Sequence, residues 1–196
     1  MRFFKENSES IIKLFINQIG IAIFSMFMIL AAHATAGKSG NAMLISVFIS
    51  IFSIVFYFVL IYNVAWEIGA KDKIRIDGGR MEKRESKGIL LGIYSNIPNF
   101  AVIGVAIVSF AIYMMGGGEW LKSIFAVLNL LFRFFVSMYL GVIEGMTSSI
   151  SDSDVAYLVQ SVLFFVFSII SAAVIHISYI LGLRDFRFFP TSKHTN

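Results

Sequence analysis

Four long stretches of the chain contain no Asp, Glu, Lys or Arg. They are residues 14–37, 39–66, 88–118 and 155–183. A helix rises about 1.5 Å per residue, so about 20 residues cross the hydrocarbon core of a bilayer, and each stretch exceeds that length. None of them alternates apolar and polar positions as the strand of a membrane barrel does. Because backbone groups in lipid must hydrogen bond within their own element, the pattern predicts four membrane-spanning helices.

A fifth apolar segment, residues 120–145, has a different pattern. Polar or small residues recur along it every three or four positions, which places them on one face of a helix. They are Lys122, Ala126, Asn129, Arg133, Ser137, Gly141 and Glu144. An interfacial helix would turn this face to water and headgroups, whereas a spanning helix would turn it towards the bundle or an aqueous path. Both arrangements fit the same pattern.

The composition agrees with a membrane protein, since 58% of the residues are hydrophobic and only 14% are charged. A soluble chain of this length could not hide so much apolar surface from water. We therefore predict an all-α, polytopic helical membrane protein in which residues 1–196 form a single integral membrane domain. The absence of cysteine excludes disulfides, thiolate metal sites and cysteine nucleophiles.

The basic residues predict an orientation, because Lys and Arg are retained on the cytoplasmic side of short loops. The N-terminal segment carries three, and the connector of residues 67–88 carries seven of the sixteen in the chain. The connector of residues 33–41 has only Lys38. We predict a cytoplasmic N-terminus and a location in the cytoplasmic membrane of a bacterial cell. The spans are expected at about residues 11–32, 42–66, 89–115 and 155–181.

The fifth segment decides the position of the C-terminus. With four spans and a re-entrant or interfacial segment at 120–145, thirteen loop Lys and Arg residues lie inside and two lie outside. With five spans the numbers are ten and five, and the basic C-terminus lies outside. Arg133 at the centre of a span would also cost about 2.5–3.5 kcal/mol on insertion scales. We favour four spans with a cytoplasmic C-terminus, and five spans remain the alternative.

The connector of residues 67–88 is a candidate docking element for a membrane or peripheral protein. Its candidate docking residues are Lys71, Lys73, Arg75, Arg80, Lys83 and Arg84. Five interspersed carboxylates reduce the net charge to +2, so a topology determinant with self-paired charges is the simpler interpretation. Ile74 and Ile76 alternate with charges before Asp77-Gly78, a pair typical of a tight turn, and this predicts a small hairpin.

Arg133 is the strongest candidate for a functional residue, because an ionisable group within a membrane segment is costly and is a functional hypothesis by default. Asn129 lies on the same predicted face. Glu144 lies eleven residues beyond Arg133, about 16 Å along a straight helix, so a partner is expected from another helix or from a lipid phosphate. The alternative interpretation is an interfacial arginine that extends to the headgroups.

Asn96 and Asn99 are the best uncharged candidates for binding a ligand. They flank Pro98, and a proline within a helix removes a backbone donor and clashes with the preceding turn. The pattern indicates either a broken helix of the kind that binds substrates in transporters, or an interfacial turn before a shorter span. His176 is a candidate proton relay, but without an apparent carboxylate neighbour it is better interpreted as a hydrogen-bonded structural histidine.

Hydroxyl and small side chains also share one face of two spans. They are Ser46, Ser50, Ser53 and Tyr57 in the second span, and Ser161, Ser168, Ala172 and Tyr179 in the last. They could line a polar path or allow close helix packing, and packing through small residues is the more general use.

No sequence motif indicates a catalytic chemistry, a cofactor or a metal site. The leading hypothesis is a non-enzymatic transporter component or membrane partner subunit. The alternatives are a membrane-embedded enzyme acting on a lipid, with Arg133 holding a phosphate, and a structural or scaffolding membrane protein. The expected partners are the lipid bilayer, a protein docked on residues 67–88, and a second copy of the chain. Nucleic acid is not expected, because the basic residues flank spans.

Overall fold

The computed structural model describes residues 2–36 and 41–187, and every regular element in these residues is helical. The elements are α1 (Arg2–Ala36), α2 (Ala42–Asp77), α3 (Lys87–Met114), α4 (Glu119–Phe135), the short 3-10 helix η1 (Ser137–Tyr139), α5 (Leu140–Thr147) and α6 (Ser153–Leu183).

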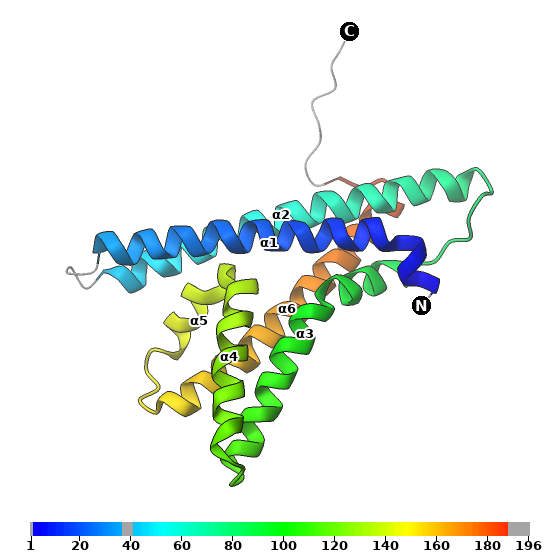
Figure 1. The fold of residues 1–196 in the computed structure, drawn as a ribbon. Helices are drawn as coiled ribbons and strands as arrows, with labels where there is room; N and C mark the ends of the chain where they lie inside the picture. The colour runs from blue at the N-terminus through cyan, green and yellow to red at the C-terminus, as the bar shows by residue number, and fades with distance from the viewer. Residues whose placement is uncertain (1, 37–40, 188–196) are drawn as a thin grey trace.

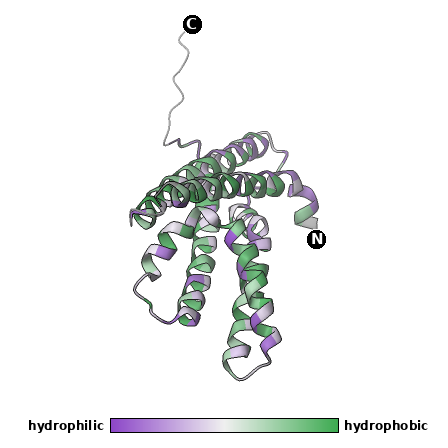
Figure 2. Ribbon diagram, turned by 60° about the vertical axis from the view of Figure 1, so that its left-hand side comes forward, coloured by the Kyte–Doolittle hydropathy of each residue, from purple (hydrophilic) through white to green (hydrophobic). Residues whose placement is uncertain are grey.

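Four of the described helices, α1, α2, α3 and α6, are long and apolar enough to cross a membrane. The remaining apolar segment forms a bent pair, in which α4 meets η1 and α5 at an angle of 83°. The predicted all-α class with four spanning helices and one exceptional segment is therefore confirmed. Figure 2 shows apolar residues along the helices and hydrophilic residues around the N-terminus and the α2–α3 connector.

Two layers of helices make up the molecule (Figure 1). α1 and α2 lie antiparallel, side by side, while α3, α4 and α6 descend from them in the view of Figure 1. α6 packs against both α2 and α3. The two layers meet around the second half of α2, so the outer ends of α1 and α2 diverge from those of α3 and α6.

Glycine allows the close contact between α2 and α6. A Cβ atom added to Gly69 would lie 2.2 Å from the carbonyl oxygen of Tyr179, and one added to Gly182 would lie 2.2 Å from that of Trp66. The serine faces of the two helices are buried as well, with Ser50, Ser53 and Ser161 all at 0% exposure. Close packing through small residues is therefore the arrangement that these faces adopt.

The bent pair enters the bundle and returns to the end from which it came. α4 runs up to α1, where Gln18 and Ser25 donate hydrogen bonds to the carbonyl oxygens of Phe135 and Ser137. The chain then turns back along α2 as α5. Nζ of Lys122, at the start of α4, lies 3.5 Å from Oδ2 of Asp154, at the start of α6. The start of α4 and the start of α6 thus lie at the same end of the bundle, as a re-entrant segment requires, while a broken fifth span stays the alternative.

The hairpin prediction for the 67–88 connector is wrong, because α2 continues as a helix to Asp77. Two alternating isoleucines are too few to specify a strand against the helix that precedes them. The ion pair of Lys71 with Glu67, spaced four residues apart, also supports the helical conformation. The turn follows at Gly79, whose φ of 67° lies in the left-handed region that glycine adopts without strain.

Pro98 does not break α3, which is continuous from Lys87 to Met114. Both interpretations of a break near Pro98, the broken helix and the interfacial turn, are therefore wrong. Packing against α6 holds the helix on both sides of the proline. Before it, Gly92 approaches Ala172, and after it, the ring centroids of Phe100 and Phe165 are 5.4 Å apart. Neighbouring helices commonly stabilise a proline within a membrane helix in this way.

Candidate functional site

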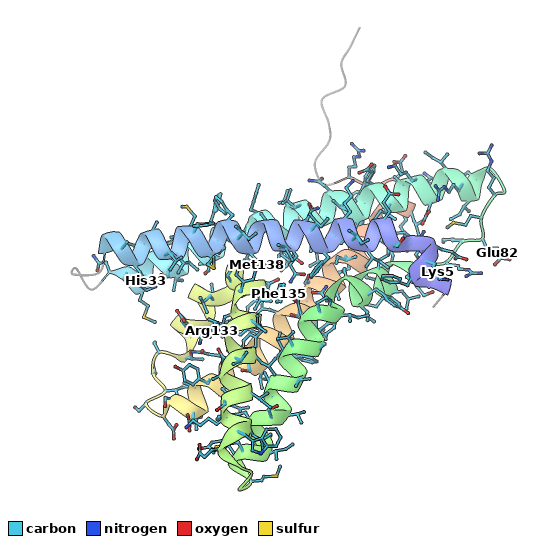
Figure 3. The ribbon with its side chains drawn as sticks, viewed as in Figure 1. Lys5, His33, Glu82, Arg133, Phe135 and Met138 are labelled. Atoms are coloured by element: carbon cyan, nitrogen blue, oxygen red, sulfur yellow. The ribbon has the colours of Figure 1, made fainter. Side chains whose placement is uncertain are left out.

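Arg133 lies in a hydrogen-bonded network at the junction of three helices (Figure 3). Its Nη1 donates to Oε1 of Glu144 on α5 at 3.0 Å, and its Nη2 donates to Oε1 of Gln160 on α6. The guanidinium also lies over the ring of Tyr157, 5.6 Å from the centroid. The side chains of Arg133 and Glu144 are 22% and 35% exposed, so the ion pair is largely enclosed by protein.

The bend in the segment creates this ion pair. Val136 adopts φ −120° and ψ 23°, which ends α4 and turns the chain by 83° into the next helix. Glu144 therefore lies beside Arg133 instead of about 16 Å along one axis. The expectation that the two residues cannot pair assumed a straight helix, and that assumption is wrong.

Gln160 connects the ion pair to a second hydrogen bond. Its Nε2 donates to Oγ1 of Thr147 at 2.8 Å, and Thr147 in turn donates to the carbonyl oxygen of Ile143 at 2.9 Å. Among the described residues, Nε of Arg133 has no acceptor although it is buried. The site is thus neutral overall, and it keeps one free donor within an apolar bundle.

Asn129 lies one turn before Arg133, on the wall of a cavity of about 230 Å³ between α3, α4 and α6. The cavity is lined by Phe110, Lys122, Phe125, Ala126, Asn129, Asp154 and Tyr157. The rings of Phe110 and Phe125, whose centroids are 4.5 Å apart, form its apolar wall. The structure thus places Asn129, as predicted, on the same polar face of α4 as Arg133.

Asn96 and Asn99 are both buried, at 1% exposure, and they contact each other. Asn99 donates to Oδ1 of Asn96 at 3.1 Å, and Asn96 donates to the carbonyl oxygen of Gly92 at 2.9 Å. Oδ1 of Asn99 has no donor within the described part of the chain. No hydrogen bond among the described residues joins this pair to Arg133.

His176 lies on α6 opposite Gly88 at the start of α3, where a Cβ added to the glycine would come within 2.9 Å of Nδ1. Nδ1 is buried and has no hydrogen-bond partner among residues 2–36 and 41–187. The hydrogen bond expected of a structural histidine is therefore not made by this nitrogen. The role of His176 as a proton relay stays a prediction.

Sequence reasoning missed the most buried carboxylate, Asp72 on α2, which is 1% exposed. Its Oδ2 lies 2.7 Å from Nζ of Lys87 and accepts a hydrogen bond from Tyr179 at 2.9 Å. Asp72 therefore joins α2, α3 and α6 at the end of the bundle that holds the connector. Its spacing of three residues from Gly69 places both on one helical face, and that was the available signal.

The predicted docking residues mostly face carboxylates of the chain itself. Lys71 pairs with Glu67, Lys73 with Asp185, Arg75 with Asp72, Lys83 with Glu85, and Arg84 with Glu82, while Arg80 is exposed. The hydrogen bond from Lys83 lowers the pKa of Glu85 and favours its charged form. This arrangement agrees with self-paired charges, and docking through the connector stays a prediction.

No protein-family model, no curated protein and no solved structure matches the chain. A functional assignment therefore depends on the geometry of its polar sites. The helices are compatible with a multi-pass membrane protein. Within the described residues, Arg133 and Glu144 form the only ion pair between α4 and α5.

Proposed function

We propose that the chain is a non-enzymatic component of a membrane transport system, with the polar site of that system on the re-entrant pair α4–α5. The observation that carries this proposal is the guanidinium of Arg133, held between the carboxylate of Glu144 and the amide of Gln160 inside a bundle of apolar helices. The lipid bilayer is its surroundings, and a partner chain or second copy is compatible with the role of a component.

The energetics favour a functional role for the network. A lone arginine at the centre of a membrane helix costs about 2.5–3.5 kcal/mol on insertion scales, and charged residues there commonly mark pathways for ions or substrates. Glu144 offsets the charge, but replacing such a pair by apolar residues is often neutral or stabilising. Stability alone therefore gives little reason for an arginine at this position.

The re-entrant geometry supports the same role. Non-helical backbone at membrane depth is tolerated where protein buries it or where it lines a water-filled cavity. Short helices that end within the membrane supply binding groups in several transporter folds. Here α4 ends at Phe135, the chain turns at Val136, and Arg133 lies in the last turn of the helix.

The network can bind a solute through the donors of Arg133. A polar or anionic solute can replace Glu144 or Gln160 as the acceptor for Arg133, and the unpartnered Nε provides a further donor. In the proposed orientation the N-terminus and the 67–88 connector face the cytoplasm. The re-entrant pair then opens towards the outside, and a lipid phosphate would have to displace Glu144 to reach Arg133.

We predict that Arg133→Gln removes solute transport. The purified protein is reconstituted into liposomes, and uptake of ³⁶Cl⁻, ²²Na⁺ and ¹⁴C-labelled L-leucine is measured against protein-free liposomes. We expect uptake of at least one probe above background, and a loss of at least about tenfold in the variant, in line with the loss of a charge-assisted contact of about 1.5–3 kcal/mol. Lys13→Gln, which removes a charge of the exposed ion pair with Glu67 outside the Arg133 network, is the matched control.

Two results would contradict the proposal. One is wild-type protein, shown to be folded by a cooperative thermal transition, that leaves the uptake of all three probes at background. The other is an Arg133→Gln protein that transports as fast as the wild type. The first result contradicts transport of these solutes by this chain alone, and the second contradicts the placement of the polar site at Arg133.

A further inference from the structure

The cavity between α3, α4 and α6 is built from two kinds of surface. Its inner wall consists of the rings of Phe110 and Phe125, which are 1% and 5% exposed. Its outer part carries Lys122 and Asp154, one cation and one anion. With a volume of about 230 Å³ it is smaller than the cavities of about 300–1,000 Å³ that hold drug-sized ligands. A ligand for it must be small and must combine an apolar part with polar ends.

Asn129 places a polar group on the wall of the cavity. The residue is only 8% exposed and lines the cavity, and its amide atoms are not among the fully buried atoms of the described residues that lack a hydrogen-bond partner. Its amide is therefore accessible from the cavity, where a ligand can hydrogen bond to it.

The two charges in the cavity form a loose ion pair. Nζ of Lys122 lies 3.5 Å from Oδ2 of Asp154, whereas strong charge-assisted hydrogen bonds measure about 2.7–2.9 Å. The side chains are 46% and 33% exposed, so solvent screens their attraction. The pair can therefore separate to accept a ligand at small cost. A ligand with both charges gives each partner a replacement of opposite charge, whereas an amine alone leaves Lys122 with only the ring of Tyr113, whose centroid lies 5.2 Å from its Nζ.

We propose that this cavity binds a small zwitterion with an apolar side group, an aliphatic α-amino acid such as leucine. The carboxylate of the ligand contacts Lys122 and its ammonium contacts Asp154, while the side group lies against Phe110 and Phe125. Asn129 hydrogen bonds to the carboxylate. The ring of Tyr157 lines the same cavity and also lies over the guanidinium of Arg133, so the cavity adjoins the network of the bent pair.

This inference deepens the proposed transport function by naming a substrate class. Only the role of the bound amino acid as a transported substrate rests on that function. The binding itself is measured on detergent-purified protein, without a membrane or a gradient. A protein that binds leucine but transports no probe contradicts the transport proposal alone. A protein that transports a probe but does not bind leucine contradicts the inference alone.

The test is equilibrium dialysis of the full-length wild-type protein with ¹⁴C-labelled L-leucine, in competition with two unlabelled analogues. Isoamylamine keeps the ammonium and the side group, and 4-methylpentanoate keeps the carboxylate and the side group. We expect saturable binding that leucine displaces at concentrations at least tenfold lower than either analogue requires. This comparison needs no variant, so it stays decisive if a substitution prevents folding.

Variants then locate the binding. Lys122→Gln and Asp154→Asn should each weaken leucine binding at least tenfold, and Asn129→Ala should weaken it severalfold. The matched control is the ion pair of Lys13 and Glu67, in which Nζ and Oε2 are also 3.5 Å apart and which lies outside the cavity. Lys13→Gln should leave binding unchanged.

Three outcomes would overturn the inference. Leucine binding that does not saturate shows that the cavity is not a site for an amino acid. Equal competition by 4-methylpentanoate shows a site for carboxylates only. Full binding by both charge variants shows that the cavity takes up apolar groups without using Lys122 and Asp154.

Discussion

At the scale of single residues, the charges inside this protein have different surroundings. Arg133 and Glu144 remain partly exposed, as a site that exchanges partners requires. Asp72 and Lys87 are far more enclosed, with side chains 2% and 13% exposed. Tyr179 also donates to Asp72, so the carboxylate is held from three helices. We infer that Asp72 stabilises the junction of α2, α3 and α6, whereas Arg133 serves the polar site.

Asp72→Asn should therefore be strongly destabilising. The amide keeps the shape of the side chain but leaves the charge of Lys87 enclosed without its counter-ion, and breaking a buried pair in this way costs about 3–5 kcal/mol. The free energy of unfolding is measured by SDS titration in mixed micelles. Asp77→Asn, at an exposed position near the end of the same helix, should change it by no more than about 0.5 kcal/mol. Equal stability of the two variants would show that the Asp72 contacts are not important for folding.

The sequence reveals which residues are unusual more readily than which residues meet. Arg133 stands out because it interrupts an apolar segment, and Asn129 follows from helical spacing. Glu144 and Gln160 could not be assigned as its partners, since their contact depends on a bend and on the position of α6. Asp72 was hidden for another reason: it lies among many charges, and only the continuation of α2 shows that it is buried.

At the scale of elements, glycine sets how closely the backbones of α2 and α6 approach, and the hydrogen bonds of Tyr57 with Ser171 and of Tyr179 with Asp72 join the same two helices. Gly182→Ala would place a Cβ 2.2 Å from the carbonyl oxygen of Trp66, so the helices must separate. We expect a loss of about 1–3 kcal/mol, as for other overpacked positions, measured by the same SDS titration. Gly104→Ala is the matched control, because nothing lies within 4 Å of its added Cβ. Removing a helical glycine there should raise stability by about 0.5–1 kcal/mol. Equal effects of the two substitutions would show that backbone contact does not limit the approach of α2 and α6.

The positions of helix breaks were the least predictable feature of the elements. Pro98 carries the strongest breaking signal in the chain, yet α3 continues through it because α6 packs beside it. The real break at Val136 has no proline or glycine within three residues. It is stabilised by tertiary contacts, since Gln18 and Ser25 of α1 bond to the carbonyl oxygens on either side of it. Such contacts between distant segments leave no local pattern.

At the scale of the whole molecule, the hydrophobic pattern was sufficient for the class and for the four long helices, because each depends only on a run of apolar residues. The layered arrangement in Figure 1 depends on contacts between helices and could not be read from those runs. The count of basic residues joined two questions that the structure separates. One is whether residues 120–145 span the membrane, and the other is which side of the membrane each end of the bundle faces. The contact between Lys122 and Asp154 places the start of α4 and the start of α6 at one end of the bundle, whichever way the protein lies in the membrane.

Single cysteines test both questions in a chain that has none of its own. Met115→Cys and Ser149→Cys lie at exposed positions on either side of the bent pair, and Glu82→Cys lies in the exposed α2–α3 connector. A membrane-impermeant maleimide applied to intact cells should label positions 115 and 149 but not position 82, and detergent should make all three reactive. If 115 and 149 react from opposite sides, the bent pair spans the membrane and the helix count is five. If only position 82 reacts from outside, positions 115 and 149 still lie on one side of the membrane, so the re-entrant geometry stands. That side is then the cytoplasmic one, and the orientation predicted from the basic connector is reversed.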